Sequence, residues 1–524
     1  MSAPAPKRSF VRGFVVLFAG SLLGKVAGLA REVIFAAAFG SGLVATGFKS
    51  AQSAVLVSAN LVTGDVLASA FVPTYARLHT DEPERARRLL WGYLLAYGVA
   101  MSGIAAVLFS VRHGAMDLLI PGASTEVRAL AGDVLGALAW CIPLFGVASI
   151  SGYALATDGR YTATSLRATL QTAGLLLGTV VALLLGSPVW LAGGFVLAWV
   201  VYTAWCIALL ARHHLLGPFS AAATGPALRM VGANLVSVLP LMVIPAGIQV
   251  ATVAQRVIAS HGDPALIASV DYAQTLSDSL VTLVSVPLGF VGLTQLSTLK
   301  EAEFVRTTRR ILSLVIGLGL PATFLVLPLT TVLVQLVYRR GSFDATAVLL
   351  TSQVAFGLFC GMTVQVLGYT LTRALSARRR NRAVLWVTLT GLAVEIGVQA
   401  LSLPTRDPML IGLGISAYGL VLTVLASILL GIHGRLLRLL ATGAPAMVVS
   451  VVAIAIPGVP PFAAAGVVAV AWATNLAVAP PYRAVLAEIR LLLTRRRAAK
   501  ATAAPASAAP DEPAVAAPVS ADAA

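Results

Sequence analysis

The chain has 524 residues, of which 58% are hydrophobic and 11% are charged, and its mean hydropathy is +0.89. This composition excludes an ordinary soluble protein and predicts an all-α protein that crosses a membrane many times. The 37 Lys and Arg outnumber the 21 Asp and Glu, but the basic residues lie at the ends of apolar segments. They therefore predict membrane topology and not a nucleic-acid partner.

The first apolar run, from about residue 12 to residue 39, follows a short basic lead without a small-residue cleavage site. We expect this segment to be retained as a membrane anchor. It contains Lys25, Arg31 and Glu32 at a depth where charged side chains usually face a bundle interior or a wet cavity. An anionic ligand or an ion pathway is therefore expected here. The alternative for Arg31 is a position near the end of a tilted helix, from which it reaches the headgroups.

Clusters of charge, Pro and Gly divide the chain into fourteen predicted spans, with both termini on one side. The spans run over about 12–39, 48–76, 89–111, 128–156, 163–186, 189–211, 227–259, 266–298, 311–336, 345–375, 383–403, 408–432, 438–457 and 461–481. Residues after about 498 are mostly Ala, Pro and Ser, a composition that predicts disorder because it cannot bury a core.

The basic residues are distributed unequally between the two sides of this topology. One set of loops and tails holds 28 of them, and four lie within or at the edge of spans (Lys25, Arg31, Lys49 and Arg256). Five lie on the other side: Arg112, Arg128, Arg339, Arg340 and Arg406. The asymmetry predicts that both termini are cytoplasmic. We expect Lys49, which opens the second span, to lie at the interface.

Short motifs recur at a nearly constant offset and indicate an internal repeat. Leu61-Val62-Thr63 and Phe71-Val72 recur as Leu280-Val281-Thr282 and Phe290-Val291, and Gly152-Tyr153 recurs as Gly368-Tyr369. Six spans separate the copies, which predicts two parallel six-helix lobes, the arrangement used for alternating access. The expected units are a lead at 1–9, an N-lobe at 10–217, a C-lobe at 218–434, two further helices at 435–493 and a tail at 494–524.

The chain contains no Ser-His-Asp arrangement, P-loop or metal-ligand spacing, so we expect neither an enzyme nor a metal site. Cys141, Cys206 and Cys360 all lie in apolar segments and indicate helix packing. The energy for any transport must then come from an ion gradient, the membrane potential or the flux of substrate.

Several motifs resemble the lipid II flippase family, the MurJ/MviN type of the multidrug/oligosaccharidyl-lipid/polysaccharide exporter superfamily. The similar residues are Gly24-Lys25, Gly28, Arg31-Glu32, Phe39-Gly40, Ala70-Phe71-Val72-Pro73, Tyr272-Ala273, Pro287-Leu288-Gly289, Leu296-Ser297 and Arg340-Gly341-Ser342-Phe343. The resemblance covers about residues 10 to 435. The chain departs from the family at four positions, where Lys25, Thr46, Ala59 and Thr275 replace an arginine, an acid and two further arginines.

The resemblance implies a flippase that moves a polyprenyl-diphosphate-linked glycan, above all the peptidoglycan precursor lipid II, across a bacterial cytoplasmic membrane. Lys25, Arg31 and Arg256 are the expected diphosphate-binding residues, although Arg256 could instead lie at a lipid-facing helix end. Glu395 and Asp65 are the expected sites for a coupling sodium ion or proton. Alternatively, Gln399 pairs with Glu395, and Asp65 neutralises Lys25.

The expected partners are membrane lipids and the cell-wall synthesis machinery. The alternative functions are export of another lipid-linked polysaccharide unit, export of drugs, and a scaffold role without transport.

Overall fold

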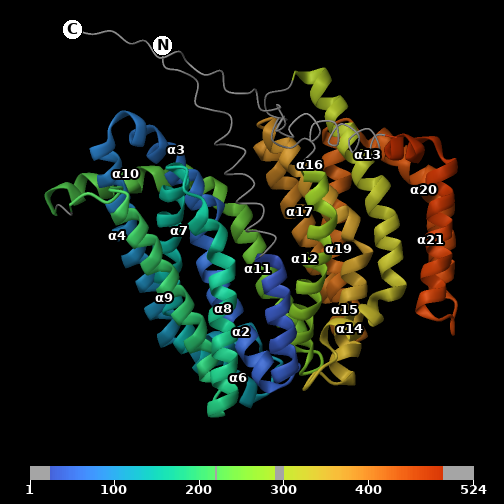
Figure 1. The fold of residues 1–524 in the computed structure, drawn as a ribbon, viewed down its shortest axis with the longest axis horizontal. Helices are drawn as coiled ribbons and strands as arrows, with labels where there is room; N and C mark the ends of the chain where they lie inside the picture. Colours follow the sequence, from blue (N-terminus) through green and yellow to red (C-terminus); the bar gives the residue numbers. More distant parts are fainter. Residues whose placement is uncertain (1–23, 219–220, 290–299, 488–524) are drawn as a thin grey trace, which may run out of the picture.

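The structure is a computed structural model, and it describes residues 24–218, 221–289 and 300–487. Every regular element in these ranges is a helix (Figure 1). A helix over 24–39 is followed by α2 (Leu43–Thr63), α3 (Asp65–Asp81), α4 (Pro83–Ser110), α5 (Arg112–Leu119), α6 (Thr125–Leu138), α7 (Cys141–Thr157), α8 (Thr162–Leu185), α9 (Val189–Arg212), α10 (Ala221–Val238), α11 (Val243–Ser260), α12 (Leu266–Gly289), α13 (Glu301–Val326), α14 (Thr330–Tyr338), α15 (Ala345–Cys360), α16 (Met362–Ala377), α17 (Asn381–Ala400), α18 (Ser402–Thr405), α19 (Met409–Leu429), α20 (His433–Ala455) and α21 (Pro461–Val478). The predicted lead at 1–9, the Phe290-Val291 and Leu296-Ser297 motifs and the tail at 494–524 lie outside the described residues.

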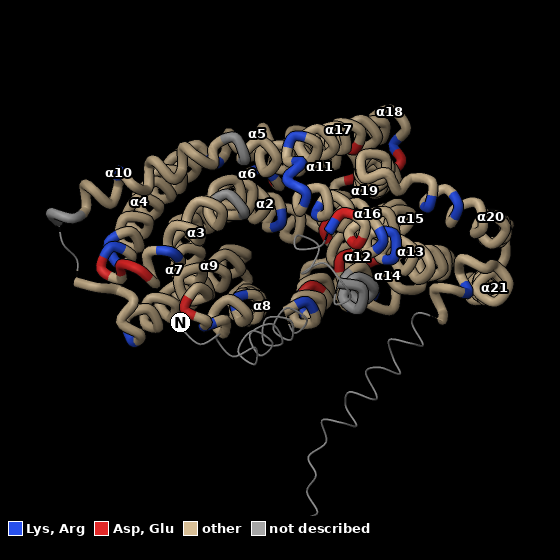
Figure 2. Tube along the Cα trace, turned by 90° about the horizontal axis from the view of Figure 1, so that it is seen from above, with Lys and Arg blue, Asp and Glu red and all other residues tan. Residues whose placement is uncertain are grey.

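The helices confirm the predicted all-α membrane fold. Within the described residues, ten helices are long and apolar enough to cross a membrane, or up to twelve if two bent pairs each form one span. The remaining two predicted spans coincide with the helix over 24–39 and with α12. Charged residues colour only short stretches of the chain when the molecule is viewed from above (Figure 2).

The seventh span begins later than the sequence predicted. Instead of one helix over 227–259, the chain forms α10, a 3-10 turn over Leu239–Met242, and then α11. The turn contains Pro240, whose missing N–H and bulky ring interrupt an α-helix. α10 packs against α3 and α4. Of the two helices, α11 is the one that is long and apolar enough to be a candidate span.

The element order repeats through the two halves and supports the predicted duplication. α6 starts at an N-cap serine, Ser124, and α15 starts at an N-cap aspartate, Asp344; each side chain accepts a backbone N–H three residues on. α6 and α7 form one bent pair, with an angle of 43°, and α15 and α16 form the other, with an angle of 48°. Pro188 and Pro408 precede α9 and α19. The same spans are thus capped and bent in both halves.

The two bends have different local causes. In the first pair, Pro143 lies in the first turn of α7, where its ring disfavours a helical carbonyl at Ala139. In the second pair the bend falls at Gly361, and the hydroxyl of Ser416 on α19 donates to the carbonyl of Gly357 at 2.6 Å. A side chain that enters the helical hydrogen-bond ladder is a recognised cause of a kink.

The helices form two groups, blue-green and yellow-red in Figure 1, with α2, α11 and α12 between them. One buried core extends from the first half to α12, α14 and α15. A second core joins α13, α16 and α20 to Trp472 and Tyr482, and α20 and α21 lie at the end of the molecule (Figures 1 and 2). The predicted lobe boundaries at 217 and 434 stay predictions.

Two motifs from the two halves meet at one end of the bundle. The N–H of Ser342 donates to the Ala37 carbonyl at 2.8 Å, and its hydroxyl donates to the Ala38 carbonyl at 3.1 Å. Gly40 and Gly341 have φ values of 59° and 56°, and each lies against the backbone of the other segment. Glycine is needed at both positions because a Cβ would be strained there and would meet a carbonyl.

Replacing Gly341 with alanine should destabilise this junction. A left-handed alanine costs about 1–2 kcal/mol, and the Cβ contact with Ala37 adds an overpacking cost of about 1–3 kcal/mol. The control is Gly159→Ala, because Gly159 also has a positive φ, 78°, but has open space around its Cβ. Thermal unfolding of the purified protein should show a clearly larger loss for Gly341→Ala. Equal losses would contradict the close approach.

Candidate functional site

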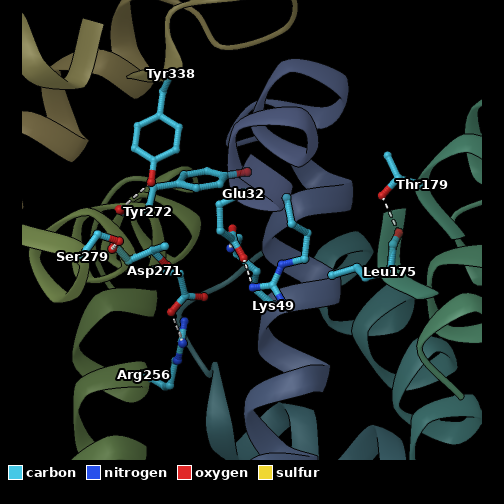
Figure 3. Close-up of polar contacts among 11 residues, drawn as sticks. Glu32, Lys49, Leu175, Thr179, Arg256, Asp271, Tyr272, Ser279 and Tyr338 are labelled. Carbon is cyan, nitrogen blue, oxygen red and sulfur yellow. Dashed lines mark hydrogen bonds and ion pairs between the residues drawn. The ribbon is translucent and has the colours of Figure 1, made fainter. Parts of the chain in front are cut away.

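A buried ion pair joins the helix over 24–39 to α2 (Figure 3). Lys49 Nζ lies 2.7 Å from Glu32 Oε2, and both side chains are about 5% exposed. The other carboxylate oxygen, Glu32 Oε1, accepts from Arg31 Nη2 at 2.6 Å. Removing such charges from water costs several kcal/mol each. The close opposite charges offset this cost. Glu32 therefore balances two cations at once.

Lys49 is buried and does not lie at the interface, so the expectation for this residue was wrong. Its ammonium lies over the ring of Tyr272 at 4.4 Å and the ring of Phe35 at 5.3 Å, contacts that attract a cation to an aromatic face. The Tyr272 hydroxyl donates to the Gly40 carbonyl at 2.6 Å, and the Tyr338 hydroxyl donates to the Tyr272 carbonyl at 3.1 Å. Lys49 thus contacts both halves of the chain.

A second ion pair joins α11 to α12, between Arg256 and Asp271 (Figure 3). The Arg256 side chain is 8% exposed, and its guanidinium also donates to the Ile267 carbonyl at 3.4 Å. These contacts place Arg256 inside the helix bundle and not at a lipid-facing helix end. Asp271 precedes Tyr272, so the two ion pairs meet at neighbouring residues of α12.

Lys25 forms a looser contact with the same helix. Its Nζ lies 3.9 Å from Asp278 Oδ2, and the two side chains are 45% and 70% exposed. The Arg31 side chain is 21% exposed. The structure therefore gathers Lys25 and Arg31, with partial exposure, and Lys49 and Arg256, fully buried, around α12.

Each half of the repeat has an ion pair between its first two corresponding helices, but the acid and the base exchange helices. In the first half the acid, Glu32, lies on the first helix and the base, Lys49, on the second. In the second half the base, Arg256, lies on α11 and the acid, Asp271, on α12. The two halves share the helix positions and differ in where the positive charge lies.

The expected ion-coupling residues lie away from this group or are not described. Glu395 on α17 is partly buried and accepts from Gln399 Nε2 at 3.3 Å, as the alternative interpretation anticipated. Among the described residues it has no basic partner. Asp65 begins α3, and its side chain lies outside the described part of the structure. The described residues contain no group of three or more His, Cys, Asp or Glu that could hold a metal ion.

Apart from Lys25, the positions that depart from the family's pattern hold neutral residues. The Thr46 hydroxyl lies 3.2 Å from both the Ser41 and the Pro264 carbonyls, and Ala59 is buried. Beside Thr275, the Gln274 amide donates to Gln255 Oε1 at 3.1 Å. Sequence reasoning did not predict the pairing of Glu32 with Lys49. Their separation of 17 residues, across a turn between two apolar helices, was the only available signal.

The chain is a multi-pass helical protein with a duplicated fold, and charges are paired among its central helices. This is the architecture of a secondary transporter. The sequence profile described as "Lipid II flippase MurJ" matches residues 35–480. The chain belongs to this family.

Sequence relatives and solved structures agree with this assignment. A probable lipid II flippase MurJ of Thermotoga maritima is 22% identical over 420 residues, which cover 80% of this chain and 83% of the relative. Its counterpart of Rhizobium tropici is 25% identical over 431 residues, covering 76% of each chain. A solved lipid II flippase MurJ in an inward closed conformation has a TM-score of 0.75 at 16% identity, covering 90% of this chain and all of that one.

The fold extends to a second group of transporters. An inward-facing multidrug resistance MATE family transporter of the MOP superfamily has a TM-score of 0.56 at 13% identity, covering 80% of this chain and 95% of that one. At this identity the likeness concerns the fold alone.

The two partners of the buried ion pair should differ in their importance for stability. Glu32→Gln leaves Arg31 and Lys49 facing each other without an acid and should cost about 3–5 kcal/mol. Lys49→Met should cost less, because Glu32 keeps Arg31 as its partner. Equilibrium unfolding of the purified protein measures both losses. A larger loss for Lys49→Met would contradict this charge balance.

Proposed function

We propose that the chain is a flippase for a polyprenyl-diphosphate-linked glycan, most specifically lipid II, which it moves from the cytoplasmic to the outer leaflet. The observation that carries this proposal is the group of four cations around α12 in a member of the MurJ family. A diphosphate entering a layer of low dielectric constant needs such cations, because its bare charge costs many kcal/mol there.

The proposed ligand contacts are Lys25, Arg31 and Arg256. Lys25 and Arg31 are partly exposed and paired with acids, so a diphosphate meets them first and competes with Asp278 and Glu32. Arg256 can contribute only after its pairing with Asp271 loosens, because its side chain is 8% exposed. The four cations exceed the three acids by one charge, which favours an anionic ligand.

Alternating access is the proposed transport mode. The contacts of Ser342 with Ala37 and of Tyr272 with Gly40 would keep one end closed and must break when that end opens. The distribution of basic residues supports an outer location for this end, with both termini cytoplasmic in a bacterial inner membrane.

The energy source in this proposal is a cation gradient, the membrane potential or substrate flux, with no catalytic or ATP-binding step. Glu395 is the proposed proton or sodium site because it is a partly buried acid on α17 without a basic partner among the described residues. Asp65 is a second proposed site. The cell-wall synthesis machinery is the proposed partner, since it uses the delivered precursor.

Multidrug export is the second candidate function, favoured by the fold shared with the MATE transporter. The excess of cations around α12 argues against a cationic drug and in favour of an anionic substrate. Export of another lipid-linked polysaccharide unit fits the same cations, whereas a scaffold role would leave them without a ligand.

Arg31→Ala should abolish flipping, and Lys25→Arg should preserve or improve it. A lost charge-assisted contact costs about 1.5–3 kcal/mol, and guanidinium binds phosphate oxygens with two parallel hydrogen bonds, which ammonium cannot do. The measurement is lipid-linked precursor reaching the outer leaflet in a flippase-depleted bacterium. Glu395→Gln is measured in the same assay. Its rate of flipping should no longer change when the ion gradient is collapsed.

Arg406→Ala is the control, because Arg406 is an exposed loop arginine outside the cation group. Membrane abundance must be equal in all variants. Normal flipping by Arg31→Ala at normal abundance would overturn the cationic mechanism. Flipping of drugs but not of precursor would support the second candidate function.

Cysteines introduced at Ser342 and Ser376 should report opposite sides of the membrane. Both side chains are exposed, and the predicted topology places Ser342 in an outer loop and Ser376 at the cytoplasmic end of α16. The test uses a membrane-impermeant thiol reagent on intact cells, in a background without Cys141, Cys206 and Cys360. Labelling of both positions from the same side would reject the topology.

A further inference from the structure

Five arginines from two helices line one pocket, which shares no residue with the cation group around α12. Arg306, Arg309 and Arg310 come from the first turns of α13, and Arg435 and Arg438 come from the first turns of α20. The arginine pocket has a volume of about 600 Å³. Lys and Arg colour both α13 and the start of α20 in Figure 2.

The third wall of the arginine pocket is a helical segment over 480–487, which follows α21. Its Ala484 and Val485 line the pocket, and the Tyr482 hydroxyl donates to the Leu439 carbonyl of α20 at 3.1 Å. The segment is therefore fixed against α20. The chain leaves the described part of the structure after residue 487, directly beside the arginines.

The walls of the arginine pocket do not balance its charge. None of the described residues that line it is acidic. On α4, the repeat counterpart of α13, Arg87 has an acid one turn away, Glu84, at 2.8 Å. The acid that begins α13, Glu301, instead pairs with Arg378 of α16 at 2.9 Å.

The arginines of the pocket thus remain open to an outside partner. Arg435 Nε donates to Ser313 Oγ at 3.1 Å, which orients this guanidinium. Arg306, Arg309 and Arg438 have no carboxylate partner among the described residues. Like charges held together favour a bound anion, and a guanidinium binds a carboxylate through two parallel hydrogen bonds.

The chain beyond residue 487 offers acids within reach of the pocket. Residues 488–500 hold one acid and five basic residues, whereas residues 501–524 hold no Lys or Arg and three acids, Asp511, Glu512 and Asp522. Asp511 lies 24 residues after residue 487. A random coil of about 24 residues spans about 25–30 Å on average, which is enough to return to the pocket. Because the acids and the arginines belong to one chain, their effective concentration is in the millimolar range.

We propose that Asp511 and Glu512 of the C-terminal tail bind in the arginine pocket. Two adjacent carboxylates can engage guanidinium groups of both α13 and α20 at once. The docked tail covers the pocket and links α13, α20 and the segment over 480–487. This contact needs no transported substrate and lies outside the proposed transport site.

The test measures the distance between the tail and the pocket in the purified full-length chain, in nanodiscs of phosphatidylcholine. Nitroxide labels are placed on cysteines introduced at Ser507 and at His433, the exposed first residue of α20. The background lacks Cys141, Cys206 and Cys360, and double electron–electron resonance gives the distances. We expect a short-distance population at about 0.15 M salt that is lost at about 1 M, where the Debye length falls from about 8 Å to about 3 Å.

Removing charge from either partner should release the tail. The double variants Asp511→Asn, Glu512→Gln and Arg309→Gln, Arg438→Gln should each lower the short-distance fraction at least about threefold, because exposed ion pairs are lost. Arg309→Lys, Arg438→Lys should lower it less, because lysine keeps the charge and loses the two parallel hydrogen bonds.

Two matched controls should leave the short-distance fraction unchanged. Asp522→Asn removes the third acid of the tail, and Arg88→Gln, Arg229→Gln removes two exposed arginines of α4 and α10. Each variant is first checked for an unchanged melting temperature. The Lys variant of the pocket takes the place of the Gln variant if the latter fails to fold.

Three outcomes would overturn the proposal. An unchanged short-distance fraction in the pocket variants would remove the site. If only the tail variant lost the short distance, the acids would pair with the basic residues at 495–500 and not with the pocket. Loss of the short distance when phosphatidylglycerol or pyrophosphate is added at constant ionic strength would assign the pocket to a lipid headgroup or a soluble phosphate.

Discussion

A charged side chain within a membrane protein must have a partner, and this requirement fixes the centre of the structure. α12 meets three such requirements, since it supplies Asp271 to Arg256, Asp278 to Lys25 and the ring of Tyr272 to Lys49. Two of these contacts reach the first half of the chain and one reaches α11. The position of α12 between the two helix groups therefore follows from charge balance as well as from apolar packing.

The duplication conserves shape more than charge. Caps, bends and element order agree between the halves, because helix packing depends on size and spacing. Charge signs do not agree: the helix over 24–39 and α2 together carry three of the central cations and one acid, whereas α11 and α12 carry one cation and two acids. The positive side of the site is thus the first half, and an anionic ligand would be held asymmetrically.

The number of candidate spans, the repeat and the placement of Arg31 within an apolar segment could be predicted from the sequence, because apolar length and charge depth are local properties. The break at Pro240 was missed, because a proline in the sequence does not always end a helix: Pro226 and Pro445 lie inside α10 and α20. Which charged residues pair with one another could not be predicted from the sequence. Lys49 follows an apolar turn and resembles an interfacial lysine, and only the folded chain shows Glu32 and Tyr272 beside it.

The contacts between the halves are of two physical kinds, and this difference bears on the proposed transport cycle. Lys25 and Asp278 form an exposed charge contact that an anionic ligand can replace. Ser342 with Ala37 and Tyr272 with Gly40 form neutral hydrogen bonds that an anion does not affect directly. Asp278 and Tyr272 lie on one rigid helix, about 9 Å apart along its axis. A ligand that displaces Asp278 therefore acts on the closed end through a movement of α12. The free energy available for opening that end is limited to the difference between the ligand's affinities for the closed and the open state.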